Sequence, residues 1–205
     1  MIEVNAGQYA PLPADEVVRR LKRNFDGNIK TFEDQIAAAS KKNDFEFVWT
    51  ITGYENVMEK AMEMIENAEN EIYIRLFPKA CRHLDEYLIQ ADKRGVKIRY
   101  IAMGNVAKKF DIQVIHPDPE HLQEIIGGRS IEVITDKTEA LVGIFETGKE
   151  DSSAINWTRN QWFIVANRDS LRHDFYHCFL EKILDQHQDP TDDEKRIYKI
   201  IKEDN

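Results

Sequence analysis

The chain has 205 residues, 42% of them hydrophobic, which is enough to bury a sizeable core. Its formal net charge is -9, and no run of Lys or Arg is long enough to follow a phosphate backbone, so direct nucleic-acid binding by this segment is disfavoured. The two cysteines form no CxxC pair, and no apolar run approaches the roughly 20 residues of a membrane span. We therefore expect a soluble, cytoplasmic protein without a disulfide framework, a structural zinc site or a cofactor.

The N-terminal part is predicted to be an extended leader over 1–13 and a helix over 14–42, since Pro11 and Pro13 disfavour a helix before Ala14. Apolar residues recur along this helix with an average spacing of 3.5 residues: Val18, Leu21, Phe25, Ile29, Phe32, Ile36 and Ala39. Such a narrow stripe favours a coiled-coil seam between two copies of the chain, and therefore a homodimer. The alternative is an amphipathic helix that lies on its own domain.

Residues 43–189 are predicted to form one α/β domain in which short strands alternate with helices. Strands are expected at 45–51, 71–77, 96–103 and 112–115, and helices at 56–70, 79–94 and 171–186, with Asn56 as a candidate cap of the first of these helices. A strand, a helix and a strand joined by short links are typical of the parallel crossover unit. We therefore expect a mixed, largely parallel sheet flanked by helices, followed by a C-terminal helix and tail over 190–205.

A β-hairpin is predicted within 127–145, where two apolar stretches flank the polar sequence DKTE. Its spacing can be compared with the catalytic pattern HxKxxxxD, in which the histidine is the nucleophile and the lysine holds phosphate oxygens. Asp136 fits the last position, but Arg129 takes the histidine position and Ile131 the lysine position. An arginine stays protonated and cannot act as a nucleophile. The hairpin is therefore either a phosphodiesterase framework without its chemistry or an ordinary hairpin with a surface arginine.

Five stretches resemble, in order and spacing, the effector domain of the TrmB family of transcriptional regulators. They are PLPADEVVRRLKRNF, VWTITGYENVMEKAMEMIENAENEIYI, ADKRGVKIRYIAMG, GRSIEVITDKTEALVG and AINWTRNQWFIVA. The resemblance implies a dimer coiled coil followed by a domain with a phospholipase D-like fold, through which some members sense sugars. It also implies an N-terminal winged helix that binds DNA. Because only thirteen residues precede the predicted helix here, we expect the chain to be either a fragment of a longer regulator or a natural form without a DNA reader. In both cases DNA binding is expected only through a winged-helix domain that is missing from this chain.

The first part of the predicted effector site lies at strand ends around the degenerate catalytic pattern. Arg75 and Arg129 are expected to donate hydrogen bonds from their guanidinium groups to a small effector. Asp136 is expected to orient one of these arginines or to accept a hydrogen bond from a hydroxyl group.

The second part of the predicted site is the sequence around Trp157. The indole of Trp157 offers an aromatic face to a sugar, and Thr158 and Asn160 offer hydrogen bonds to its hydroxyl groups. The alternative is that Trp157 packs in the core while Thr158 and Asn160 build a turn.

No metal site and no catalytic residue are predicted. His173 and His177 lie four residues apart on a predicted helix, but there is no HExxH arrangement and no evident third ligand, so an exposed helix face is the favoured interpretation. We expect a non-enzymatic, effector-sensing dimerisation domain of a transcriptional regulator, without membrane contact. The alternatives are an active phospholipase D-like phosphodiesterase or nuclease and an oligomerisation module that binds no ligand.

Overall fold

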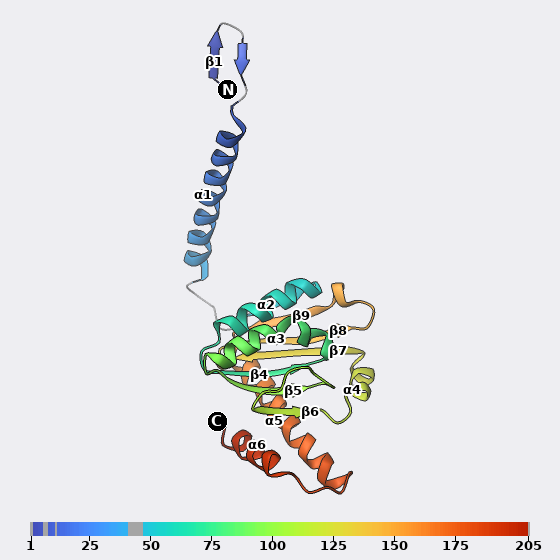
Figure 1. The fold of residues 1–205 in the computed structure, drawn as a ribbon. Coiled ribbons are helices and arrows are strands. Elements are labelled where there is room, and N and C mark those ends of the chain that lie inside the picture. The colour runs from blue at the N-terminus through green and yellow to red at the C-terminus, as the bar shows by residue number, and fades with distance from the viewer. Residues whose placement is uncertain (1, 6–7, 11, 41–46, 205) are drawn as a thin grey trace. The chain divides into compact units, whose positions relative to one another are not determined.

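The computed structural model describes residues 2–5, 8–10, 12–40 and 47–204, and side-chain exposure for residues 12–35 and 47–204 (Figure 1). The chain divides into two compact units, Met1–Asp44 and Phe45–Asn205, which we describe one at a time. Three parts of the predictions lie outside the described residues or side chains: the end of the helix after Ser40, the seam positions Ile36 and Ala39, and the strand residues 45–46.

The first unit contains a strand pair and one long helix. Strand β1 (Ile2–Asn5) pairs antiparallel with β2 (Gln8–Ala10), and helix α1 spans Ala14–Ser40, so the predicted N-terminal helix is confirmed. The apolar stripe of α1 is exposed in the single chain: Leu21 is 63% exposed, Phe25 is 67% exposed and Phe32 is 63% exposed. A row of exposed apolar side chains of this kind requires a covering partner to become buried.

The second unit is an α/β domain, as predicted. Its elements are β3 (Val48–Thr52), α2 (Tyr54–Asn67), β4 (Glu71–Leu76), α3 (Pro78–Lys93), β5 (Lys97–Ala102), β6 (Ile112–Ile115), α4 (Pro119–Ile126), β7 (Gly128–Thr135), β8 (Glu139–Glu146), the short 3-10 helix η1 (Glu150–Ser152), β9 (Ala154–Thr158), α5 (Gln161–Leu184) and α6 (Asp192–Glu203). The seven strands form one mixed sheet in the order β3-β9-β8-β7-β4-β5-β6.

The sheet is less parallel than we expected from the sequence. Only β4–β5 and β5–β6 pair in parallel among the described strands, whereas β3–β9, β4–β7, β7–β8 and β8–β9 pair antiparallel. The reason is local, because β7 and β8 form the predicted hairpin through a three-residue turn and β9 follows after a short link. A strand that returns through so short a connection can only pair antiparallel.

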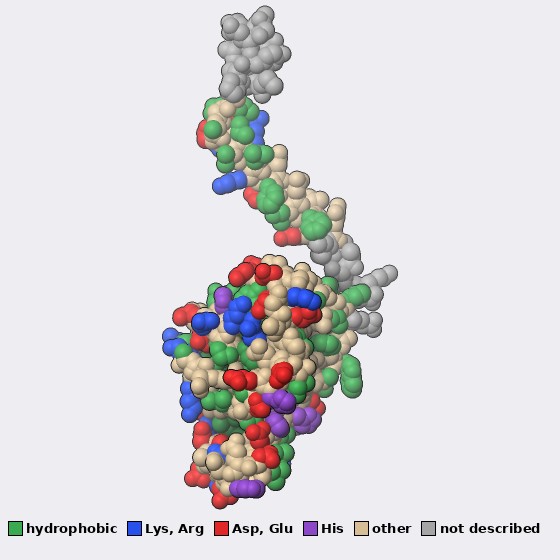
Figure 2. Space-filling view, turned by 90° about the vertical axis from the view of Figure 1, so that its right-hand side faces the viewer, with side chains coloured by type: hydrophobic (Ala, Val, Ile, Leu, Met, Phe, Trp, Pro, Cys, Tyr) green, Lys and Arg blue, Asp and Glu red, His purple; other side chains and the backbone are tan. Residues whose placement is uncertain are grey.

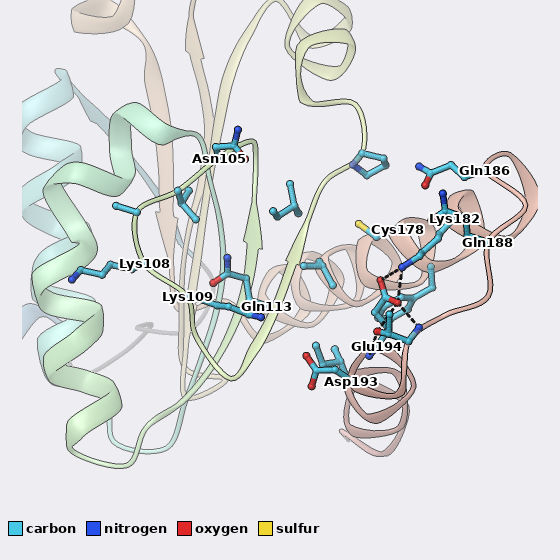
Figure 3. A pocket seen from close by; sticks show the side chains of 18 residues that line it. Asn105, Lys108, Lys109, Gln113, Cys178, Lys182, Gln186, Gln188, Asp193 and Glu194 are labelled. Atoms are coloured by element: carbon cyan, nitrogen blue, oxygen red, sulfur yellow. Dashed lines mark hydrogen bonds and ion pairs between the residues drawn. The ribbon is translucent and has the colours of Figure 1, made fainter.

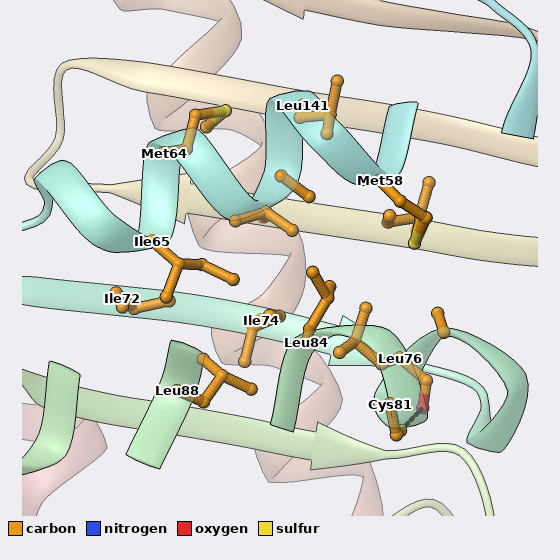
Figure 4. Close-up of a cluster of buried hydrophobic side chains, with 14 of the residues drawn as sticks. Met58, Met64, Ile65, Ile72, Ile74, Leu76, Cys81, Leu84, Leu88 and Leu141 are labelled. Atoms are coloured by element: carbon orange, nitrogen blue, oxygen red, sulfur yellow. Dashed lines mark hydrogen bonds between the residues drawn. The ribbon is translucent and has the colours of Figure 1, made fainter. Parts of the chain in front are cut away.

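Two layers of helices cover the sheet. Helices α2 and α3 pack on one face, and α5 and α6 on the other. Figure 4 shows the first layer, in which apolar side chains of β4 point at those of the two helices. Its fully or almost fully buried members include Met58, Met64, Ile65, Ile72, Ile74, Leu76, Leu84 and Leu88. The alternation of β4 sends Tyr73 and Arg75 to the opposite face.

Two helix boundaries differ from the prediction. Helix α2 begins at Tyr54 with Gly53 before it, and the side chain of Asn56 donates to the carbonyl of Thr52, so Asn56 is not the cap. Helix α5 begins at Gln161, ten residues before the predicted start, and includes the apolar run 162–166. The side chain of Asn160 caps α5 by accepting a hydrogen bond from the amide of Phe163 at 3.0 Å.

The C-terminal helix is tied to the sheet by charged groups. Thr191 and Glu194 form a capping box at the start of α6. Near its end, Asp204 accepts a hydrogen bond from the hydroxyl of Tyr73 at 2.6 Å and pairs with Arg99 at 2.6 Å. This contact fixes the last turn of the described chain against the sheet. Within the part of the chain that the structure describes, none of the helices is long and apolar enough to cross a membrane.

Candidate functional site

Arg129 lies at the edge of the sheet where β3 and β4 end and helices α2 and α3 begin. In open α/β sheets, the carboxyl ends of the strands are the usual place for a binding site. Gly128 allows the chain to enter β7 here, because a Cβ at this position would lie 2.2 Å from the carbonyl oxygen of Phe145. The local sequence therefore brings Arg129 to this edge through a close backbone approach that only glycine permits.

The guanidinium of Arg129 has one carboxylate partner. Its Nη2 donates to Oε1 of Glu150 at 2.7 Å, and Glu150 belongs to η1 in the link between β8 and β9. Both side chains are partly exposed, Arg129 by 27% and Glu150 by 25%. A backbone hydrogen bond is the largest cause that lowers the pKa of Glu150 below 4.5, and the charges of Arg129 and Lys79 lower it further.

Tyr54 lies beside this ion pair with a buried hydroxyl group. The residue is 7% exposed, and its Oη has no hydrogen-bond partner. The ring packs against Phe145 with the centroids 5.0 Å apart and against His83 at 5.5 Å in an edge-to-face arrangement. Burial is the main cause that raises the pKa of Tyr54 above 10.0, and Glu55 adds to it, while Arg129 and Arg82 oppose it.

Two further cations come from the first turns of α3. Lys79 places its Nζ 4.7 Å from the centroid of the Tyr54 ring, and Arg82 is close enough to act on the charge of the same tyrosine. Figure 2, which faces this edge of the sheet, shows Lys and Arg side chains gathered on one part of the surface. We call Tyr54, Lys79, Arg82 and Arg129 the basic edge cluster. Of these four, the sequence pattern identifies only Arg129, because Tyr54 lies on α2, which meets β7 only in the folded chain, and Lys79 and Arg82 lie on α3, which packs on α2.

Arg75 lies on the opposite face of the sheet and is fully engaged within the fold. Its Nε donates to Glu132 at 2.8 Å, its Nη2 also binds Glu132, and its Nη1 binds Asp174 of α5. Burial opposes the charge of Arg75, but the hydrogen bonds and charges of Glu132 and Asp174 raise the pKa of the guanidinium above its ordinary value. The side chain is 14% exposed, so this arginine holds the sheet and α5 together.

Asp136 lies at the other end of β7, roughly 23 Å from Arg129 at about 3.3 Å per residue of strand. Its carboxylate accepts three backbone hydrogen bonds of 2.7 to 2.9 Å, from the amides of Glu69, Asn70 and Glu71. Burial raises the pKa of Asp136, but these hydrogen bonds outweigh it and lower the pKa below 3.8. Asp136 thus fixes the entry into β4, and one small effector would not reach both it and Arg129.

Trp157, Thr158 and Asn160 lie together on β9 and the start of α5. Thr158 is fully buried, and its hydroxyl donates to the carbonyl of Phe47 at 2.7 Å and accepts from the amide of Asn160 at 3.0 Å. The Trp157 ring stacks on Trp49 with the centroids 4.6 Å apart. The geometry thus agrees with the turn that we considered as the alternative for Thr158 and Asn160.

The structure therefore distributes the six predicted residues over separate places. At the lysine position of the degenerate pattern, Ile131 is fully buried in the core.

His116 and His177 lie with their rings 5.7 Å apart on the α5 face. No group of three or more His, Cys, Asp and Glu side chains within the described residues is arranged to hold a metal ion.

A separate cavity of about 610 Å³ lies between β6 and the link from α5 to α6 (Figure 3). Amide side chains such as Asn105, Gln113 and Gln186 line it, together with the ion pair of Lys182 and Glu194. Neither the six predicted residues nor the members of the basic edge cluster line this cavity, so it is distinct from that cluster.

Several known proteins are similar to this chain. YrhO of Bacillus subtilis (strain 168), an uncharacterized protein, is 30% identical over 189 residues, which make up 90% of this chain and 66% of YrhO. Among solved structures, TrmBL2, an archaeal chromatin protein, has a TM-score of 0.48 and 18% identity, with 80% of this chain and 66% of that chain covered. The chain therefore spans about two thirds of these relatives.

Two other solved structures cover most of their own chains. NucT from Helicobacter pylori has a TM-score of 0.49 and 11% identity, over 64% of this chain and 97% of that chain. Nuc from Salmonella typhimurium, a phospholipase D family member, has a TM-score of 0.45 and 12% identity, over 63% and 95%. The model of the family "Transcriptional regulator TrmB, EBD N-terminal subdomain" matches residues 47–185. The resemblance inferred from the sequence is thus confirmed, and the chain belongs to the TrmB family of transcriptional regulators, with the N-terminal subdomain of the effector-binding domain over most of its length.

Proposed function

We propose that this chain is the effector-sensing and dimerisation part of a transcriptional regulator. A small molecule, such as a sugar or a sugar derivative, binds at the sheet edge around Arg129, and its binding is transmitted to the DNA-binding domain of the regulator. The observation that carries the proposal is the arrangement at this edge. Arg129 stands where a nucleophile would be needed, with one partly exposed partner and the unpartnered hydroxyl of Tyr54 beside it.

The same arrangement supports a sensing role without catalysis. A guanidinium stays protonated and can bind a ligand but cannot attack a phosphorus atom. The lysine position is occupied by Ile131, which is buried in the core and offers no group to a phosphate oxygen. Asp136, at the third position, binds backbone amides instead of a ligand. We therefore propose that the pattern has kept its supporting aspartate and lost its chemistry.

The dimerisation part of the proposal rests on α1. Its exposed apolar stripe has the spacing of a coiled-coil seam, and burying it against a second copy would remove Leu21, Phe25 and Phe32 from water. A dimer would also explain how one bound effector acts on DNA at a distance. The effector has to bind two arrangements of the dimer with unequal affinity, because only such a difference can shift the equilibrium between them.

A thermal-shift screen of the whole chain tests the sensing role. A ligand that binds only the folded state raises its stability by RT ln(1 + [L]/Kd). The library contains sugars, sugar phosphates, nucleotides and amino acids, and a hit should be lost in Arg129→Ala. Arg159→Ala is the matched control, because Arg159 also pairs with a single carboxylate, that of Glu139, but lies away from the cluster. No stabilising compound would favour an oligomerisation module, and hydrolysis of bis(p-nitrophenyl) phosphate would favour an enzyme.

Sedimentation equilibrium tests the dimer. Replacing Leu21 and Phe25 with Lys should convert a dimer into monomers, because charged groups would enter the seam. Asp34→Lys is the control, since Asp34 lies on the opposite side of α1 at 3.6 residues per turn. A monomeric wild-type chain, or a dimer that survives the double substitution, would contradict dimerisation through this helix.

A further inference from the structure

The hydroxyl group of Tyr54 is the starting point. It is buried, it finds no partner in the chain, and its ring is fixed by Phe145 and His83. Buried polar groups in proteins nearly always have a hydrogen-bond partner, so an isolated one next to a surface site indicates that the partner comes from a bound molecule. A tyrosine hydroxyl can donate to an oxygen of such a molecule.

The groups around this hydroxyl select a negatively charged ligand. Lys79 lies over the Tyr54 ring, and Arg82 and Arg129 both act on the charge of its hydroxyl. In addition, α2 and α3 both begin at this edge without a side-chain cap, since Gly53 and Phe77 precede them. Helix N-termini carry free amides and a partial positive charge, which add to the attraction for an anion.

Glu150 already occupies part of the basic edge cluster, because its carboxylate binds Arg129. Its carboxylate binds Arg129 at 2.7 Å, and η1, which carries it, lies against α2. The contact is partly exposed, so a competing anion can reach it from solvent. Once Glu150 leaves, the three cations remain beside Tyr54, and Glu55, whose side chain is exposed, is the acidic residue that acts on the Tyr54 hydroxyl. A dianion balances that excess of positive charge.

We propose that the basic edge cluster binds the phosphate group of a phosphate monoester, such as a sugar phosphate, and that this phosphate displaces Glu150 from Arg129. The proposal rests on the proposed sensing function and names its ligand class. A phosphate offers three acceptor oxygens, which suit the fork of a guanidinium, the ammonium of Lys79 and the hydroxyl of Tyr54. The displacement removes the contact that holds η1 to Arg129. Ligand binding would therefore also change the link between β8 and β9, which the ligand itself does not contact.

Isothermal titration calorimetry of the whole chain with glucose 6-phosphate, inorganic phosphate and glucose tests the ligand class. Both phosphates should bind and glucose should bind at least tenfold more weakly. Arg129→Ala should weaken phosphate binding at least tenfold, because a charge-assisted pair is lost. Tyr54→Phe, which keeps the ring packing, should weaken it about three- to tenfold. Arg159→Ala should leave it unchanged.

Glu150→Gln tests the displacement. Removing the competing charge should strengthen phosphate binding several-fold, the opposite direction from the other two substitutions in the site. In the wild-type chain, hydrogen exchange of the amides in 150–152 should become faster when glucose 6-phosphate binds, since η1 loses its contact with Arg129. Weaker binding by Glu150→Gln, or slower exchange in η1, would overturn the displacement.

The outcomes separate this inference from the proposed function. If glucose or another neutral compound binds at Arg129 while both phosphates fail, the sensing function stands and the phosphate site is wrong. If the phosphates bind equally well to wild type, Arg129→Ala and Tyr54→Phe, the binding is to an adventitious anion site only, and the inference is again overturned. If no compound of the wider library binds, the sensing function itself fails as well.

Discussion

Arg75 and Arg129 lie on neighbouring strands of one sheet but on opposite faces, and they are used differently. Arg75 is largely buried on the α5 face, where Glu132 binds two of its nitrogens and Asp174 a third. Arg129 lies on the α2 and α3 face and binds one carboxylate, which is itself partly exposed. An arginine with all its partners inside the fold is part of the framework. One with a single replaceable partner retains donors for a ligand.

The largest effect is expected from Arg75→Ala. The substitution leaves the buried carboxylate of Glu132 without its cation, which typically costs about 3–5 kcal/mol. Urea denaturation of the whole chain measures the loss in the free energy of unfolding. A loss below about 1 kcal/mol, the value for exposed pairs, would show that Arg75 is not the framework residue of the comparison.

A second substitution in the same background isolates the cause. Adding Glu132→Gln to Arg75→Ala should recover at least about 1 kcal/mol, because the buried group left behind is then neutral. The measurement is a double-mutant cycle by urea denaturation, with Glu132→Gln alone as the fourth corner. Additive losses would mean that the two side chains do not act as a pair.

A smaller effect concerns the pH dependence of stability and His116, which is buried near Arg75 and Asp174. Burial lowers the pKa of His116 below 6.5, His177 and Arg75 lower it further, and Asp174 and Glu181 act in the opposite direction. As the pH falls below about 6.5, the unfolded chain therefore binds a proton that the folded chain does not, and stability is lost. His116→Gln should lose less stability than wild type between about pH 7.5 and about pH 5 in urea denaturation. An identical pH profile would contradict a lowered pKa.

The smallest effect is expected for the stability of Arg129→Ala, the counterpart of Arg75→Ala. The pair with Glu150 is about a quarter exposed on each side, and because solvent screens such pairs, it adds little to the free energy of unfolding. Urea denaturation should thus show a nearly unchanged midpoint in the absence of ligand. A loss of several kcal/mol would make Arg129 a second framework arginine and remove the basis of the comparison.

Much of the fold could be predicted from local patterns in the sequence. The hairpin was visible because β7 and β8 are apolar stretches separated by a polar turn, and α1 because its apolar residues recur at helical spacing. The start of α5 was missed, although Asn160 is a typical cap, because the helix carries apolar residues on more than one side and lacks a clear stripe. Its inner side packs on the sheet, and α6 covers another part of it.

The candidate site could be predicted only in part. Arg129 could be predicted because it occupies the histidine position of the degenerate pattern, and the spacing of that pattern along a single strand is visible in the sequence. Tyr54, Lys79 and Glu150 were missed because each looks ordinary in its own segment: the first turn of a helix, an exposed lysine and a polar link. Asp136 is predicted to belong to the site because it follows a strand. The sequence does not show that this end of β7 lies at the edge of the sheet opposite to Arg129.

The sequence by itself determined most of the elements, the family and the presence of an arginine at the histidine position of the pattern, since these depend on residue type and spacing along the chain. Only the tertiary structure decided how many carboxylate partners each arginine has and whether they are buried. Arg75 binds Asp174 across 99 residues, and Arg129 acts on the charge of Tyr54, which lies in another layer of the fold. Charge and burial depend on distances through space. The difference between Arg75, whose donors are bound within the fold, and Arg129, which retains donors for a ligand, therefore arises only when the sheet and its helices come together.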